Sequence, residues 1–110
     1  GPEFEADPGM KEFKAFAAKY MPRVNPDDKT AVPGYVCAYA IAEVLRRCGS
    51  DLTRENLLKQ ATTFKDFPVP LLLPGITLTN SSTNYSAYHA MEVMQFNGQR
   101  WVGLGDLIRI

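Results

Sequence analysis

The sequence predicts a mixed α and β fold in which three helices are followed by a β-hairpin and short strands. Apolar residues recur at helical spacing in three separate segments of the first 64 residues. From Leu71 onward the period changes: Ile76 and Leu78 alternate with Thr77 and Thr79, which is typical of a short half-buried strand. Asn97 and Gly98 then form the strongest short signal for a hairpin turn, because both residues accept a positive φ.

Length and composition describe one ordinary domain. The chain has 110 residues, of which 45% are hydrophobic and 22% are charged. Its 12 basic and 12 acidic residues cancel, so we expect no nucleic-acid partner, because nucleic acids attract basic surfaces. No apolar run approaches the ~20 residues that a membrane-spanning helix needs.

The first residues read as a remnant of cloning. Gly-Pro-Glu-Phe is typical of a protease-site remainder followed by restriction-site codons, and residues 1–5 are therefore excluded from the fold. The folded part is expected to cover residues 6–110. The natural start of the parent protein, with any secretory signal, is expected to lie outside this sequence.

The first helix is expected over residues 8–21. Asp7 is a good N-cap, and Pro8 suits the first helical position because its missing N–H has no partner there. Pro22 ends the pattern. The residues of the apolar face follow helical spacing; they are Met10, Phe13, Phe16, Ala17 and Tyr20.

The second helix is the most apolar segment of the chain. It reads GYVCAYAIAEVLRRC and is expected over residues 33–48, starting near Thr30 or Gly34, with Gly49 as its C-terminal stop. Arg46 and Arg47 in its last turn complement the helix dipole. A helix that is apolar on most sides needs neighbours on most sides.

Two cysteines, Cys37 and Cys48, lie on this second helix. Eleven residues of helix separate them by about 16 Å, which is too far for a disulfide between them. We expect both to be small buried core residues. The alternative is that one of them pairs with a cysteine outside this sequence. Their spacing, with one histidine in the chain, fits no zinc site.

The third helix is expected over residues 53–64, with Thr53 as its N-cap. A break at Phe67-Pro68-Val69-Pro70 follows, because the residue before each proline is pushed to an extended conformation. Strands are expected within residues 75–79, 87–96 and 99–104, with a final extended piece at 107–110.

Residues with catalytic potential are few, and no enzyme signature is present. His89 could act as a general base, but it is more often a cross-strand or surface histidine. Asp27 and Asp28 lie in a Pro/Asn turn, where carboxylates are usually solvated. The hydroxyls of Ser81-Ser82-Thr83 have no base nearby in sequence, and Trp101 is expected to pack across a hairpin. We expect no catalytic residue, no metal site and no cofactor.

Tyr35 is the one residue singled out for ligand contact. It is expected to open the second helix, where backbone N–H groups are free and the dipole is positive. Its ring and hydroxyl could then contact a small anionic or aromatic ligand. The alternative, that Tyr35 only packs, is at least as well supported by the residues.

Three segments together resemble a known family. They read DPGMKEFKAFAAKYMP, then PGYVCAYAIAEVLRRCGSDLTRENLLKQA, then LLLPGITLTNSSTNYSAYHAMEVMQFNGQRW. This ordered set resembles the C-terminal part of periplasmic solute-binding proteins, and the branched-chain amino acid (Leu/Ile/Val-type) receptors of ABC transporters in particular. The resemblance covers nearly all of residues 6–110, and no single motif in it is specific.

The resemblance implies an α/β fold, as the C-terminal fragment of a two-lobe type I periplasmic-binding-protein fold. It implies capture of a small solute, an amino acid or related carboxylate, aromatic ones included, for import through ABC permease membrane subunits. It also implies a periplasmic location in a Gram-negative bacterium, after secretion by a signal peptide. Tyr35 corresponds to the tyrosine that opens the alanine-rich helix in relatives, where it can approach the cleft.

This chain departs from a complete receptor because the central strands of both lobes are missing from it. The exposed apolar faces that result predict self-association. Two alternatives remain beside the receptor. One is an independent protein-interaction domain that uses the apolar helix 34–48, and the other is a fragment of an enzyme, which the missing nucleophile, base and metal ligands make the weakest.

Overall fold

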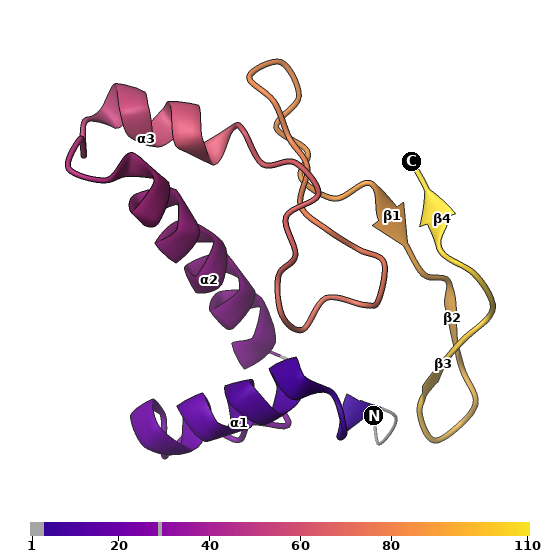
Figure 1. Ribbon diagram of the computed structural model, residues 1–110. Helices are drawn as coiled ribbons and strands as arrows, with labels where there is room; N and C mark the ends of the chain where they lie inside the picture. The colour runs from indigo at the N-terminus through magenta and orange to yellow at the C-terminus, as the bar shows by residue number, and fades with distance from the viewer. Residues whose placement is uncertain (1–3, 29) are drawn as a thin grey trace.

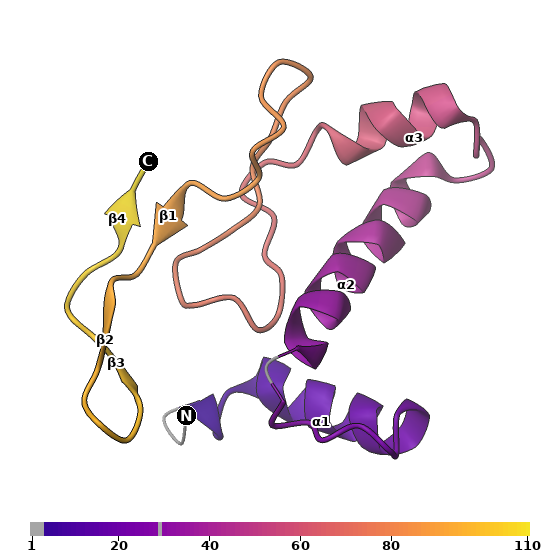
Figure 2. The ribbon, with the colours of Figure 1, turned by 180° about the vertical axis from the view of Figure 1, so that it is seen from behind.

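The computed structural model describes residues 4–28 and 30–110 and contains helices followed by small antiparallel strands. The predicted mixture of helices and short strands is therefore confirmed. Figure 1 shows α1 lying across the N-terminal end of α2, with α3 folded back from the other end of α2. The strands form an arm on the far side of a long irregular loop, and the reverse view in Figure 2 gives the same arrangement.

Helix α1 (Pro8–Tyr20) begins as the sequence predicts. The Asp7 carboxylate accepts a hydrogen bond from the backbone N–H of Met10 at 3.0 Å, which satisfies one of the free donors of the first turn. Phe13 is fully buried and Ala17 is 1% exposed, so the predicted apolar face does turn inward at its centre. The expected cloning remnant lies mostly outside the described residues, although Phe4 lines a small cavity beside α1.

Helix α2 (Ala31–Cys48) begins two residues before the predicted start at residue 33. Pro33 does not prevent this, because a proline in the first turn removes a backbone donor that has no helical partner. Asp28 orders the entry by accepting hydrogen bonds from the backbone N–H and the hydroxyl of Thr30, at 3.0 and 2.8 Å. Gly49 ends the helix with a φ of 58°, as expected.

Helix α3 (Arg54–Ala61) is shorter than the predicted range 53–64. Thr53 caps it as expected, accepting from the N–H of Asn56 at 3.3 Å. Its C-terminal end comes early because the hydroxyl of Thr62 binds back to the carbonyl of Leu58 at 2.9 Å. The chain then turns and buries Phe64, which is 5% exposed.

The core lies between one side of α2, the end of α3 and the irregular segment 64–78. Its buried members are Val36, Val44, Cys48, Phe64, Val69 and Leu78. Several apolar residues of α2 outside this core are exposed, among them Ile41 and Leu45, in agreement with the expectation that apolar faces of this helix are left uncovered in this chain.

The strand predicted at residues 75–79 is reduced to a single bridge. Leu78 and Phe67 exchange two backbone hydrogen bonds of 2.9 Å. The ladder stops there because the segment that leads to Leu78 contains Pro68, Pro70 and Pro74, which lack the N–H that a ladder needs.

The strand predicted at residues 87–96 is wrong as one continuous element. It is interrupted at residues 92–93 and forms β1 (Ala90–Met91) and β2 (Met94–Phe96). β2 pairs with β3 (Trp101–Gly103), and β1 pairs with β4 (Ile108–Arg109), both antiparallel. The final extended piece thus completes a two-stranded arm, which the sequence did not indicate.

The turn of the arm is longer than the two-residue hairpin that the sequence suggests. Phe96 pairs with Trp101, so residues 97–100 form the connection and the return strand begins at 101 rather than 99. Asn97 causes the extension, because its side-chain oxygen accepts from the N–H groups of Gln99 and Arg100 at 3.0 and 2.9 Å. Gly98 has the expected positive φ, at 96°.

The whole chain is more open than a compact protein of its size. Its accessible surface is 8113 Å², whereas a compact monomer of 12.2 kDa exposes about 6,100 Å². Its Cα radius of gyration is 16.0 Å, against about 13 Å for a compact domain of this length. Among the described helices, none is long and apolar enough to cross a membrane.

Candidate functional site

Tyr35 lines an apolar hollow between α1 and α2, which we call the helical groove. The groove has a volume of about 470 Å³. Its walls come from the second half of α1, the following loop and the first two turns of α2; they are Phe16, Met21, Val24, Thr30, Ala31, Gly34, Tyr35 and Ala38.

The ring of Tyr35 is held by two aromatic neighbours. Its centroid lies 5.1 Å from that of Phe13 and 5.2 Å from that of Phe16, both in edge-on geometry. Burial raises the pKa of the Tyr35 hydroxyl above its usual value, and the nearby groups of Glu12 and Tyr39 add to the increase. Tyr35 is therefore a neutral phenol anchored by packing.

Tyr35 does not open α2, and this corrects one reason for selecting it. Because α2 begins at Ala31, Tyr35 lies in the second turn, beyond the first four N–H groups that a helix leaves free. Among the described residues, those that form the walls of the helical groove carry no charged side chain. The groove is thus suited to an apolar group, and it supplies no ion-pair partner for a carboxylate.

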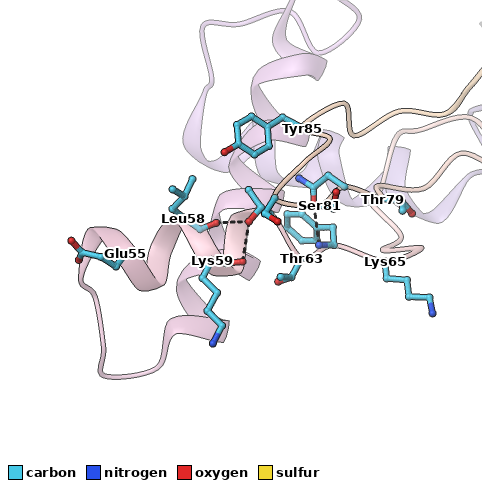
Figure 3. Close-up of a pocket in the computed structure, with 12 residues that line it drawn as sticks. Glu55, Leu58, Lys59, Thr63, Lys65, Thr79, Ser81 and Tyr85 are labelled. Carbon is cyan, nitrogen blue, oxygen red and sulfur yellow. Dashed lines mark hydrogen bonds between the residues drawn. The ribbon is translucent and has the colours of Figure 1, made fainter.

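A second, larger hollow lies between α3 and the loop at residues 79–85, and Figure 3 shows it. Its volume is about 710 Å³. We call this hollow the hydroxyl pocket, because residues with hydroxyl groups are frequent in its walls. These residues are Thr62, Thr63, Thr79, Ser81, Ser82 and Tyr85, and Phe64 and Asn80 lie among them.

Most polar atoms of the hydroxyl pocket are already used by the fold. The side chain of Asn80 accepts from the N–H of Phe64 at 3.0 Å and donates to the carbonyl of Ala61 at 2.8 Å. The hydroxyl of Thr79 accepts from the N–H of Asp66 at 2.9 Å. These bonds join the end of α3 to the loop, so the pocket is built around a structural junction.

The charged side chains around the hydroxyl pocket do not converge. Glu55, Lys59 and Lys65 extend in different directions, away from Ser81 and Thr63, in Figure 3. Ser81 also accepts from the N–H of Asn84 at 3.1 Å within its own turn. The arrangement offers no nucleophile and base within reach of each other.

His89 is held by a backbone group. Its Nε2 lies 2.8 Å from the carbonyl oxygen of Thr79, which can only accept, so Nε2 donates. A small cavity of about 190 Å³ adjoins it, with Asp66 and Arg109 among its walls. This geometry supports a structural role for His89 rather than a role as a general base.

The two cysteines differ in environment. Cys48 is buried in the core, as predicted, whereas Cys37 is exposed, so the expectation of burial is wrong for Cys37. Both thiols are free, and no group of described residues could hold a metal ion.

The remaining residues considered for chemistry have structural roles. Trp101 packs on Phe96 across the arm, with ring centroids 5.7 Å apart, as predicted. Asp27 pairs with Lys14 at 3.5 Å. The hydrogen bonds from Thr30 lower the pKa of Asp28 below its usual value, as for a carboxylate in a turn.

An ion cluster on α2 was not anticipated from the sequence. Glu43 accepts from Arg46 at 2.8 Å and from Arg47 at 2.7 Å, and the Arg47 guanidinium lies 4.6 Å from the ring centroid of Phe64. These bonds lower the pKa of Glu43 to about 2. The spacing of three and four residues between Glu43 and the two arginines is the sequence signal that could have predicted this cluster. The cluster fastens α2 to the segment after α3.

Comparison of the chain with protein-family models, with curated proteins and with solved structures finds no match.

Proposed function

We propose that this chain is the C-terminal part of a periplasmic solute-binding receptor of the branched-chain amino acid type. In the full protein it helps to capture an amino acid or related carboxylate, aromatic ones included, for an ABC permease. The proposal is one of binding rather than catalysis. It places the full protein in the periplasm of a Gram-negative bacterium.

The observation that carries the proposal is the amount of apolar surface left without a partner. Ile41 and Leu45 of α2 are 59% and 45% exposed, and Ile108 and Ile110 of the arm are 49% and 69% exposed. A two-stranded arm and a one-sided helix need further elements to cover them. Lobes built around central sheets outside this sequence would supply those elements, in agreement with the resemblance.

Tyr35 would have a limited role in such a receptor. The helical groove can accept an aliphatic or aromatic side chain, and the phenol can donate one hydrogen bond. The carboxylate and ammonium groups of an amino acid must find partners outside the groove. We therefore assign Tyr35 to the wall of the site and not to charge recognition.

The test is titration calorimetry of the complete parent protein with leucine, isoleucine, valine, phenylalanine and benzoate. A receptor binds at least one of them and gains thermal stability from it. Tyr35→Phe should retain binding, whereas Tyr35→Ala should weaken it; Tyr88→Ala, at an exposed tyrosine in the wall of neither hollow, is the control. Absence of any binding or melting shift across the panel would contradict the proposal.

The alternative is an independent interaction domain that binds a protein partner through helix 34–48. The exposure of Ile41 and Leu45 favours it as well. The sequence that precedes residue 6 in the parent gene distinguishes between the two proposed functions. A secretory signal followed by alternating strands and helices supports the receptor, and another architecture supports the interaction domain.

A further inference from the structure

One side of α2 carries small or apolar residues along its length; α1 lies across the helical groove at its N-terminal end, and the rest of this side is exposed. We call it the open face; its residues are Ala31, Gly34, Ala38, Ile41, Ala42 and Leu45. At 100° per residue these side chains fall within one apolar stripe, opposite the buried Val36 and the partly buried Ala40. Figures 1 and 2 agree that, apart from α1 across its N-terminal end, no described element lies against the side of α2 turned away from the loop at 64–78.

The open face is complementary to itself. Its N-terminal half has the small residues Gly34 and Ala38, and its C-terminal half has the large residues Ile41 and Leu45. The two halves are equidistant from the middle of the helix. When a second α2 runs antiparallel about that middle, Leu45 of each copy lies over Gly34 of the other, and Ile41 lies over Ala38.

The space needed for such a contact is present. A Cβ atom built on Gly34 would meet nothing within 4 Å, so the backbone is accessible there. The helical groove opens beside it and could accept the end of Leu45 from the second copy. Small residues allow helix axes to approach to about 8 Å.

The area is close to what a stable dimer requires. Counting the exposed parts of the open face and of the neighbouring Phe16, Tyr20 and Val24, each copy offers on the order of 600 Å² of apolar surface. A standard interface buries about 800 Å² per partner. The chain also exposes about 2,000 Å² more than a compact monomer of its mass.

We propose that a second copy of this chain covers the open face, with the two α2 helices antiparallel about a two-fold axis near Tyr39 and Ala40. The helix dipoles then oppose each other favourably. Glu43 and Arg47 remain on the side of α2 that faces the core, so the dimer contact does not bury these charges. This proposal does not depend on the receptor function, which concerns the complete parent protein.

The first test is sedimentation equilibrium of the 110-residue chain from about 1 μM to about 1 mM, the range that spans moderate affinities. The chain should pass from monomer to dimer. Ala38→Glu should raise the dimer dissociation constant about tenfold or more, because it buries an unpaired charge. Ala15→Glu, on the exposed side of α1, is the matched control and should dimerise as the unsubstituted chain does.

The second test determines the register by disulfide trapping in a Cys37→Ala chain. Gly34→Cys and Leu45→Cys chains should form a disulfide when mixed and oxidised, because the antiparallel pairing places these positions opposite each other. Gly34→Cys alone should not cross-link, because its two copies lie about 16 Å apart along the axis. Circular dichroism of every variant verifies that its helices are intact.

Three results would overturn the proposal. They are a monomer at all concentrations, a dimer that Ala38→Glu leaves unchanged, and cross-linking of Gly34→Cys with itself, which indicates parallel helices. Should Ala38→Glu reduce the helix content, the trapping experiment decides alone. Failure of the dimer and failure of solute binding are distinguishable, because the second is measured on the parent protein.

Discussion

Single side chains join segments of this chain that are distant in the sequence. Arg47 is the clearest case, because its guanidinium binds Glu43 on one side and lies over the rings of Phe64 and Phe67 on the other. The side chains of Arg47 and Glu43 are 23% and 14% exposed, so water screens the pair less than it screens a surface pair.

The Glu43 carboxylate should make stability depend on pH. Its pKa is lowered from 4.5 to about 2 in the folded chain, so the folded state binds the proton less readily than the unfolded state does. Its contribution is complete above pH 4.5 and is lost as the pH falls towards 2. Urea unfolding of the unsubstituted chain and Glu43→Gln should therefore differ most above pH 5 and converge at low pH.

Glu55→Gln is the matched control for that pH profile. Glu55 is exposed on α3, and within residues 4–28 and 30–110 it makes no ion pair. Its substitution should leave the difference between pH 5 and pH 2 nearly unchanged. An equal pH dependence for Glu43→Gln and the unsubstituted chain would show that the cluster does not form.

Asn80→Ala should destabilise the junction between α3 and the loop at 79–85. The change removes the bonds to Phe64 N–H and Ala61 carbonyl and leaves both groups without a side-chain partner. We expect a loss of about 1–3 kcal/mol in the free energy of unfolding, measured by urea titration. Asn84→Ala, in an exposed turn, should change it by about 0.5 kcal/mol or less, and equal losses would refute the junction.

The elements differ in how well they are supported. Helices α1 and α3 have side-chain N-caps, and α2 has a glycine stop and buries Val36 and Val44. The arm has neither advantage. All residues of β2, β3 and β4 are exposed, and a two-stranded ribbon without a covered face is marginal in water.

Hydrogen exchange should therefore separate the arm from the helices. Backbone amides of Gln95 and Val102, which face each other in the arm, should exchange about 100-fold or more faster than the amide of Val44 in α2. Exchange followed by nuclear magnetic resonance at low protein concentration measures this. Equal protection in the arm and in α2 would mean that another surface covers the arm.

The molecule as a whole is a set of helices around a small core with a projecting arm. Its principal extents are 49, 37 and 19 Å, so it is flat and long for its mass. The excess surface is apolar in large part, from Tyr85 and Leu104 as well as from α2. Such a surface is typical of a chain that is completed by another surface.

Small-angle scattering tests this open arrangement. At the lowest concentrations the monomer should have a radius of gyration near 16 Å, as in the structure, and not near the 13 Å of a compact domain. A chain that lacks residues 97–110 should retain the helical signal in circular dichroism. A compact monomer would mean that the arm folds back onto α2.

Local signals in the sequence were enough to predict that the three helices form and that the arm turns near Gly98, but not the length of that turn. Asp7, Thr53 and Gly49 act within a few residues of their own positions, so their roles follow from backbone chemistry. The burial of Cys48 and the packing of Trp101 across the hairpin were predicted from the usual behaviour of these residue types; the structure supplies Phe96 as the partner of Trp101. The receptor family and the role of Tyr35 in binding remain predictions.

The pairing of β1 with β4, the loss of the strand at 75–79 and the exposure of Cys37 depended on tertiary contacts. Each results from which segment comes to lie beside which, and that depends on proline positions, on long-range bonds such as those of Asn80, and on how much core is available. The apolar pattern of α2 predicted that this helix has buried sides, but it did not indicate which side faces the core. One side is taken by the core around Phe64, and on the other, beyond the contact with α1, no element among the described residues covers Ile41 and Leu45.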